Sequence, residues 1–134
     1  MESSGERYLD TSALIAALDR ADSYFSTYER LFKQRPPLAA SSLVIVEAYG
    51  WFLRRHGQYK ALQVLQFAAE LRPFTIVPFG VEELGRIAVL LYKFADQKLS
   101  MADAHGLLIM RERRVKACWS TDRHLGLTGV RLVN

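Results

Sequence analysis

The sequence lacks a second cysteine, so Cys118 has no partner within the 134 residues and an internal disulfide is excluded. It also lacks any run of about 18–20 uninterrupted apolar residues, which is the length that a membrane-spanning helix needs. The segment MESSGERYLD begins acidic and has none of the basic-then-apolar layout of a secretory signal. We therefore expect a soluble, cytoplasmic protein with no membrane contact. In it Cys118 is a buried strand residue rather than a reactive thiol.

Histidine is scarce as well, and the spacing of His56, His105 and His124 does not indicate a zinc site. We expect His105 to lie on the surface. The chain has no internal repeat, low-complexity tract or linker, and half of its residues are apolar, which is enough for one conventional core. The sequence therefore predicts a single domain over residues 1–134, in which residues 1–6 form a flexible leader.

The formal net charge of +4 suits an anionic partner such as nucleic acid. Many ordinary domains carry this much charge, and the basic residues are scattered along the chain. The charge is therefore only a weak indication of nucleic-acid binding.

Short apolar runs alternate with amphipathic segments along the whole chain. Strands are predicted at 7–10, 38–40, 74–77, 115–120 and 130–133. Helices are predicted at 11–18, after Asp22 as far as Pro36, and at 42–56, 58–71, 81–94 and 100–113, with a short helix or turn at 122–127. Strands that alternate with one or two helices indicate a parallel sheet with helices on both faces, so we predict a helix-rich α/β fold.

Four acidic residues stand at unusual places. Glu47 lies within the apolar segment 43–49, where an unpaired buried carboxylate would cost several kcal/mol. The alternative is that Glu47 lies on the solvent edge of a helix. Asp10, Asp103 and Asp122, each taken alone, have the simpler interpretation of a helix or turn cap.

Taken together, the four acids are more informative. Asp10 and Asp122 follow predicted strands, and ligands of parallel sheets collect at the carboxyl ends of the strands. Asp103 and Glu47 lie in early turns of helices that could begin at the same edge. Such a cluster would repel itself unless a divalent cation were bound, and Mg²⁺ or Mn²⁺ favours oxygen ligands. The sequence leaves open whether the four converge.

Four segments resemble the motifs of PIN-domain nucleases in order and spacing. They are residues 9–14 (LDTSAL), 42–47 (SLVIVE), 96–104 (DQKLSMADA) and 119–125 (WSTDRHL). The resemblance runs from about Arg7 to the last strand. The short single-domain length is similar to that of the toxin branch called VapC.

This resemblance implies an α/β/α sandwich around a parallel sheet. It implies that Asp10, Glu47, Asp103 and Asp122 are catalytic and hold one or two Mg²⁺ or Mn²⁺ ions. Metal-activated water would then hydrolyse RNA and leave 5′-phosphate and 3′-hydroxyl ends. The two supporting hydroxyl positions match Ser12 and Ser120. Asp96 matches a further acidic position near the rim, although a loop aspartate is an equally good interpretation.

The resemblance also implies two protein partners, a second copy of the chain and a small antitoxin. Antitoxins of this kind insert a helix or tail into a groove beside the active site. Aromatic residues are candidates for that groove, although core or dimer-interface positions are the simpler interpretation for each: Phe25, Tyr28, Phe32, Trp51 and Phe52.

Other functions remain open alongside the ribonuclease toxin. They are a non-catalytic PIN-fold module that binds RNA or protein, a housekeeping RNA-processing nuclease, and a metal-dependent phosphatase or DNA nuclease.

Overall fold

Residues 5–134 are described by a computed structural model of the chain, in which five strands form one parallel sheet. The strands are β1 (Arg7–Leu9), β2 (Leu38–Ser41), β3 (Phe74–Val77), β4 (Ala117–Trp119) and β5 (Arg131–Val133). Their order is β3-β2-β1-β4-β5, and all neighbouring pairs are parallel. The predicted parallel α/β fold is therefore confirmed.

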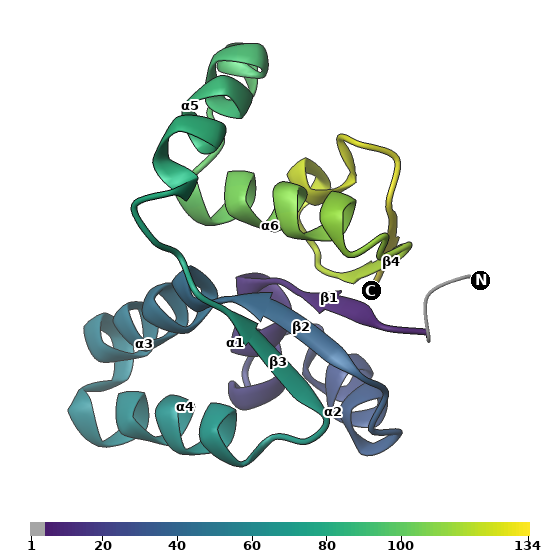
Figure 1. Cartoon of the computed structure of the whole chain (residues 1–134). Coiled ribbons are helices and arrows are strands. Elements are labelled where there is room, and N and C mark those ends of the chain that lie inside the picture. The colour runs from purple at the N-terminus through teal and green to yellow at the C-terminus, as the bar shows by residue number, and fades with distance from the viewer. Residues whose placement is uncertain (1–4) are drawn as a thin grey trace.

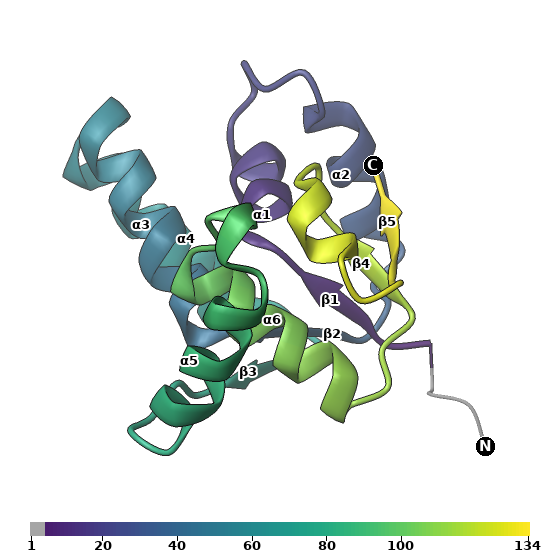
Figure 2. The same ribbon diagram turned by 90° about the horizontal axis from the view of Figure 1, so that it is seen from above.

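Helices cover both faces of this sheet (Figures 1 and 2). They are α1 (Thr11–Leu18), α2 (Phe25–Lys33), α3 (Ser42–His56), α4 (Gln58–Glu70), α5 (Glu83–Lys93) and α6 (Met101–Glu112), with 3₁₀ turns η1 (Ala95–Gln97) and η2 (Arg123–Gly126). All the predicted helices are present, whereas η1 was not predicted, because a single 3₁₀ turn carries no periodic signal. Within residues 5–134 no helix is long and apolar enough to cross a membrane.

Alternation along the strands divides the core into two layers. Leu9 and Trp119 pack with α1 to α4, while their neighbours Tyr8 and Cys118 pack with α5 and α6. This follows from the period of two in a strand, which sends successive side chains to opposite faces of the sheet. The prediction that Cys118 is buried is confirmed, since none of it is exposed.

His105 corrects one expectation, because it lies inside the molecule and not on its surface. Only 3% of it is exposed, and its Nδ1 lies 2.6 Å from Ser41 Oγ. Its ring also meets the edge of Phe79. The surface prediction was wrong because α6 is buried along most of its circumference, between the sheet and α5, so a polar residue type does not mark a solvent face there.

The first residues of the described chain are tied to the C-terminal end of α6. Arg113 donates from Nε and Nη2 to the two carboxylate oxygens of Glu6, over 3.0 and 2.8 Å. Residues 1–4 of the predicted leader lie outside the described residues. The single-domain boundary and the leader stay predictions.

Candidate active site

Neighbouring strands β1 and β4 bring the first two site residues together. Leu9 pairs with Trp119 in the parallel register, so Asp10 and Ser120 follow at the same edge of the sheet. The Asp10 amide donates to the Trp119 carbonyl over 3.1 Å, which extends the strand pairing by one step. Asp10 also occupies the N-cap position of α1, but its side chain makes no capping hydrogen bond. Its carboxylate is therefore not explained as a helix cap.

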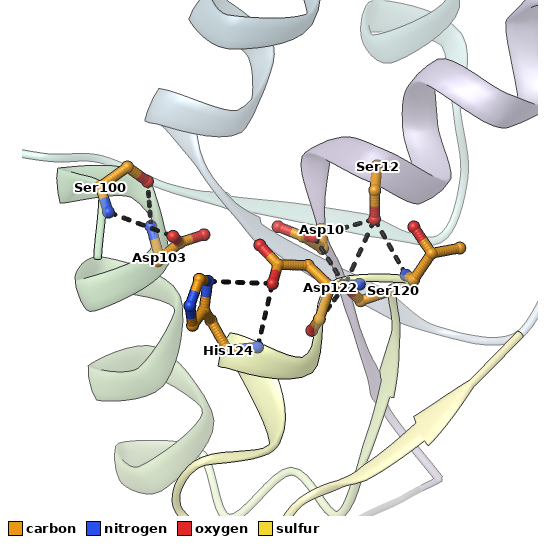
Figure 3. A network of polar contacts seen from close by, with 8 residues as sticks. Asp10, Ser12, Ser100, Asp103, Ser120, Asp122 and His124 are labelled. Carbon is orange, nitrogen blue, oxygen red and sulfur yellow. Dashed lines mark hydrogen bonds and ion pairs between the residues drawn. The ribbon is translucent and has the colours of Figure 1, made fainter. Parts of the chain in front are cut away.

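The Asp10 carboxylate is buried and is held by two hydroxyl groups. Ser120 Oγ donates to Asp10 Oδ2 over 2.7 Å, and Ser12 Oγ donates to the same oxygen over 3.0 Å (Figure 3). Burial raises the pKa of Asp10 from 3.8 to about 6, the serine hydrogen bonds oppose that rise, and the charge of Asp103 adds to it. Ser12 and Ser120 therefore both contact the Asp10 carboxylate, and their supporting role in the site stays a prediction.

Asp103 serves as a helix cap and also faces the site. Its Oδ2 accepts from the Ser100 amide over 3.1 Å, and Ser100 Oγ accepts from the Asp103 amide over 3.0 Å. This is the capping box that the sequence allowed. The cap accounts for one carboxylate oxygen, and α6 begins at the same edge where Asp10 and Asp122 lie (Figure 3).

Asp122 combines the same two features. Its Oδ1 accepts from the amide of His124 over 3.0 Å and so caps the short η2 turn. One ligand atom from each of Asp103, Asp122 and His124 lies within 4.8 Å of the others. Ser120 Oγ links this group to Asp10, since it accepts from the Asp122 amide over 2.9 Å while it donates to Asp10.

His124 is the residue that sequence reasoning missed. The spacing of the three histidines does not indicate a zinc site, and it says nothing of their distance from the acids. The signal that could have found it is the spacing of two residues between Asp122 and His124, because a tight turn can bring both side chains to the same ion.

Glu47 lies at the side of this cluster. It is an exposed residue of α3, as the solvent-edge alternative expected, and Thr11 Oγ1 donates to its Oε1 over 2.7 Å. Because Thr11 directly follows Asp10, this hydrogen bond joins α3 to the start of α1 next to the buried carboxylate. The structure therefore places Glu47 beside the other three acids, with its side chain exposed to solvent.

A groove of about 450 Å³ runs along α1 and α3 from Glu47. Trp51 and Ile15 give it apolar walls, and Arg54 gives it a positive charge. The guanidinium of Arg55 lies 4.8 Å from the centre of the Trp51 ring, on its face.

The other aromatic candidates for a partner groove have different surroundings. Tyr28 and Phe52 are fully buried in the core, and Phe32 packs edge-on against Phe67 and Trp119. The simpler interpretation as core residues therefore holds for Tyr28 and Phe52.

Asp96 is exposed in η1, where its carboxylate accepts from the Gln97 amide group over 3.3 Å.

The donor set fits a hard divalent cation. Carboxylates from three separate segments converge on one sheet edge, and one of them is buried with a raised pKa. An uncompensated group of this kind is electrostatically unfavourable, and a divalent cation bound by carboxylate oxygens would compensate it. Residues 103, 122 and 124 supply ligand atoms close enough to share one ion.

Comparisons with known proteins agree with this architecture. The family model described as the PIN domain matches residues 7–129. The crystal structure of Mycobacterium tuberculosis VapC20, described as a sarcin–ricin loop cleaving toxin, is similar with a TM-score of 0.81 and 21% identity over 92% of this chain and 95% of that chain. A toxin–antitoxin complex from Klebsiella pneumoniae is similar with a TM-score of 0.62 and 16% identity over 96% of both chains. No curated protein sequence matches significantly.

Proposed function

The chain belongs to the PIN domain family, and on that premise we propose that it is a metal-dependent endoribonuclease, the toxin of a bacterial type II toxin–antitoxin pair acting in the cytoplasm. The observation that carries the proposal is that Asp103 and Asp122 lie together at the carboxyl edge of the sheet, where Ser120 links Asp122 to the buried Asp10 (Figure 3). The fold shared with VapC20, which is described as a sarcin–ricin loop cleaving toxin, supports RNA as the substrate class.

In this proposal Asp10, Asp103 and Asp122 hold one or two Mg²⁺ or Mn²⁺ ions, and Glu47 completes the set from the solvent side. When bound, a divalent cation supplies charge to a phosphate oxygen and lowers the pKa of a water molecule. Ser12 and Ser120 keep the Asp10 carboxylate in one orientation through their hydrogen bonds to Oδ2.

Basic side chains beside the acids fit a polyanionic substrate. Arg54 lines the groove next to Glu47, and Arg123 is exposed directly after Asp122. They would hold the flanking phosphates of an RNA strand while the acids face the scissile one.

The test is RNA cleavage by the chain purified free of any partner, stripped with EDTA and resupplied with Mg²⁺ or Mn²⁺. Asp10→Asn and Asp103→Asn are expected to lower the cleavage rate by at least about 100-fold, since each removes a negative ligand from the site. Glu70→Gln, an exposed acid on α4, is the matched control and should cleave like the parent protein.

Other outcomes identify the competing functions. Folded protein that binds RNA without cutting it is a binding module. Cleavage of DNA or of phosphomonoesters with none of RNA identifies a different hydrolase. RNA cleavage without growth arrest, when the chain is expressed alone, favours a housekeeping nuclease over a toxin.

Two protein partners belong to the same proposal. The groove between α1 and α3 ends at Glu47, so an antitoxin segment seated there would cover the acids. If an antitoxin binds there, its co-expression should relieve growth arrest, and Trp51→Ala should reduce this relief.

The second partner is another copy of the chain. Figure 1 shows α5 standing off from the sheet beyond α6, and the segment around it exposes four large apolar side chains, Val81, Leu84, Val89 and Tyr92. Exposed apolar side chains gathered on α5 and the residues just before it are consistent with a protein interface. Sedimentation equilibrium should therefore show a homodimer that Val89→Ser weakens.

A further inference from the structure

His124 extends the metal cluster by a nitrogen donor. Its Nδ1 lies 3.0 Å from Asp122 Oδ1, and one ligand atom from each of His124, Asp122 and Asp103 lies within 4.8 Å of the others (Figure 3). The amide of His124 also donates to Asp122 Oδ1 over 3.0 Å. The η2 turn thus sets the backbone so that the imidazole and the carboxylate face the same point.

The distance between these two atoms fits shared coordination. Around an octahedral ion with ligands at about 2.1 Å, two adjacent ligand atoms lie about 3.0 Å apart, and two opposite ligand atoms lie about 4.2 Å apart. In the structure Nδ1 and Oδ1 form an ion pair over 3.0 Å, and this distance equals the first of these spacings. The whole group lies within 4.8 Å, which exceeds the second spacing by up to about 0.6 Å, a difference that side-chain rotation would have to supply on binding.

We propose that His124 is a nitrogen ligand of the ion that Asp103 and Asp122 hold, and that it makes the site select Mn²⁺ over Mg²⁺. The inference rests on the metal site of the proposed function and deepens it. The ligand is a neutral imidazole that binds through Nδ1 and carries its proton on Nε2. Mg²⁺ prefers oxygen ligands and water, whereas nitrogen donors bind first-row transition ions more tightly, so one imidazole separates the two ions.

The direct test is pulsed electron paramagnetic resonance of the wild-type protein loaded with Mn²⁺, after removal of any histidine tag. An imidazole ligand couples its ¹⁴N nucleus to the Mn²⁺ spin and gives electron spin-echo modulation, which labelling with ¹⁵N-histidine should change. This readout requires neither RNA nor catalysis. A Mn²⁺ spectrum without any nitrogen modulation would overturn the proposal.

A second test compares affinities measured by titration calorimetry with Mn²⁺ and with Mg²⁺. His124→Gln is expected to raise the Kd for Mn²⁺ at least about tenfold and to change that for Mg²⁺ by less than about threefold. His56→Gln, an exposed histidine of α3, is the matched control and should leave both constants unchanged. Equal loss for both ions would mean that His124 only orients Asp122, which contradicts the proposal.

The two proposals fail in different ways. Nitrogen-coupled Mn²⁺ in a protein that cuts no RNA would support the ligand and refute the ribonuclease. Metal-dependent RNA cleavage without nitrogen coupling would refute the ligand and support the ribonuclease. Absence of any divalent binding by the folded protein would refute both.

Discussion

Replacing Asp10 with asparagine should stabilise the metal-free protein at neutral pH while it removes activity. The folded-state pKa of Asp10 is about 6 against an ordinary value of 3.8, mainly because the carboxylate is buried with 5% of the residue exposed. The folded protein therefore binds the carboxyl proton of Asp10 more tightly than the unfolded chain does. The stability that this tighter proton binding adds is fully present below pH 4, and it is lost as the pH rises through the folded-state pKa of about 6.

The magnitude follows from the pKa difference. One pKa unit corresponds to about 1.4 kcal/mol, so a rise from 3.8 to about 6 means that the ionised carboxylate costs about 3 kcal/mol at pH 7.5. Asparagine carries no charge, and its carbonyl oxygen can still accept from Ser12 and Ser120. The amide nitrogen has to find a partner, which reduces the gain to about 1–3 kcal/mol, or an increase in Tm of about 3–10 °C.

The assay is thermal unfolding in EDTA between pH 4 and pH 8, for the parent protein and Asp10→Asn. Near pH 4 the Tm of Asp10→Asn should be equal to or below that of the parent, and the Tm of the variant relative to the parent should increase as the pH rises through 6. Mn²⁺ should then raise the Tm of the parent by more than that of the variant, which keeps the other ligands but lacks the Asp10 carboxylate. Asp10→Asn that is less stable than the parent at pH 7.5, or a difference that does not change with pH, would refute this account of the site.

Three further substitutions test a hydrogen bond to Asp10, a buried polar contact and the hydrophobic core. Ser120→Ala removes a hydrogen-bond donor to Asp10, so the pKa of Asp10 should rise further. In the same Tm assay without metal, the loss of stability should then occur at a higher pH. Ser41→Ala removes the cap of α3 and the partner of His105, and urea unfolding should show a loss of about 2–4 kcal/mol. Phe52→Ala empties a fully buried position and should cost about 3–5 kcal/mol in the same measurement.

Matched controls separate these effects from general damage. Ser26→Ala on α2 and Tyr59→Ala on α4 change exposed positions and should alter stability by less than about 0.5 kcal/mol. If Ser41→Ala is as mild as Ser26→Ala, the contact between Ser41 and His105 does not stabilise the core. A loss below about 1 kcal/mol for Phe52→Ala would mean that the surrounding helices collapse into the space.

Local patterns account for most of the secondary structure. Hydrophobic periodicity and the positions of glycine and proline predict the helix ends closely. Gly57, for example, ends α3 with a positive φ of 89° that favours glycine. Alternation on β1 and β4 follows from strand geometry alone. These features could be predicted because each depends on residues within about one turn or one strand.

The sequence by itself determined the alternating strands and helices, the order of the four acids and the absence of a disulfide. Tertiary structure decided what those acids contact, because only the pairing of β4 with β1 brings residues about 110 positions apart to Asp10. It also decided that His105 is buried, that Glu47 is exposed and that His124 lies beside Asp103. These environments depend on which elements pack against one another, and long-range packing leaves no periodic trace in the chain.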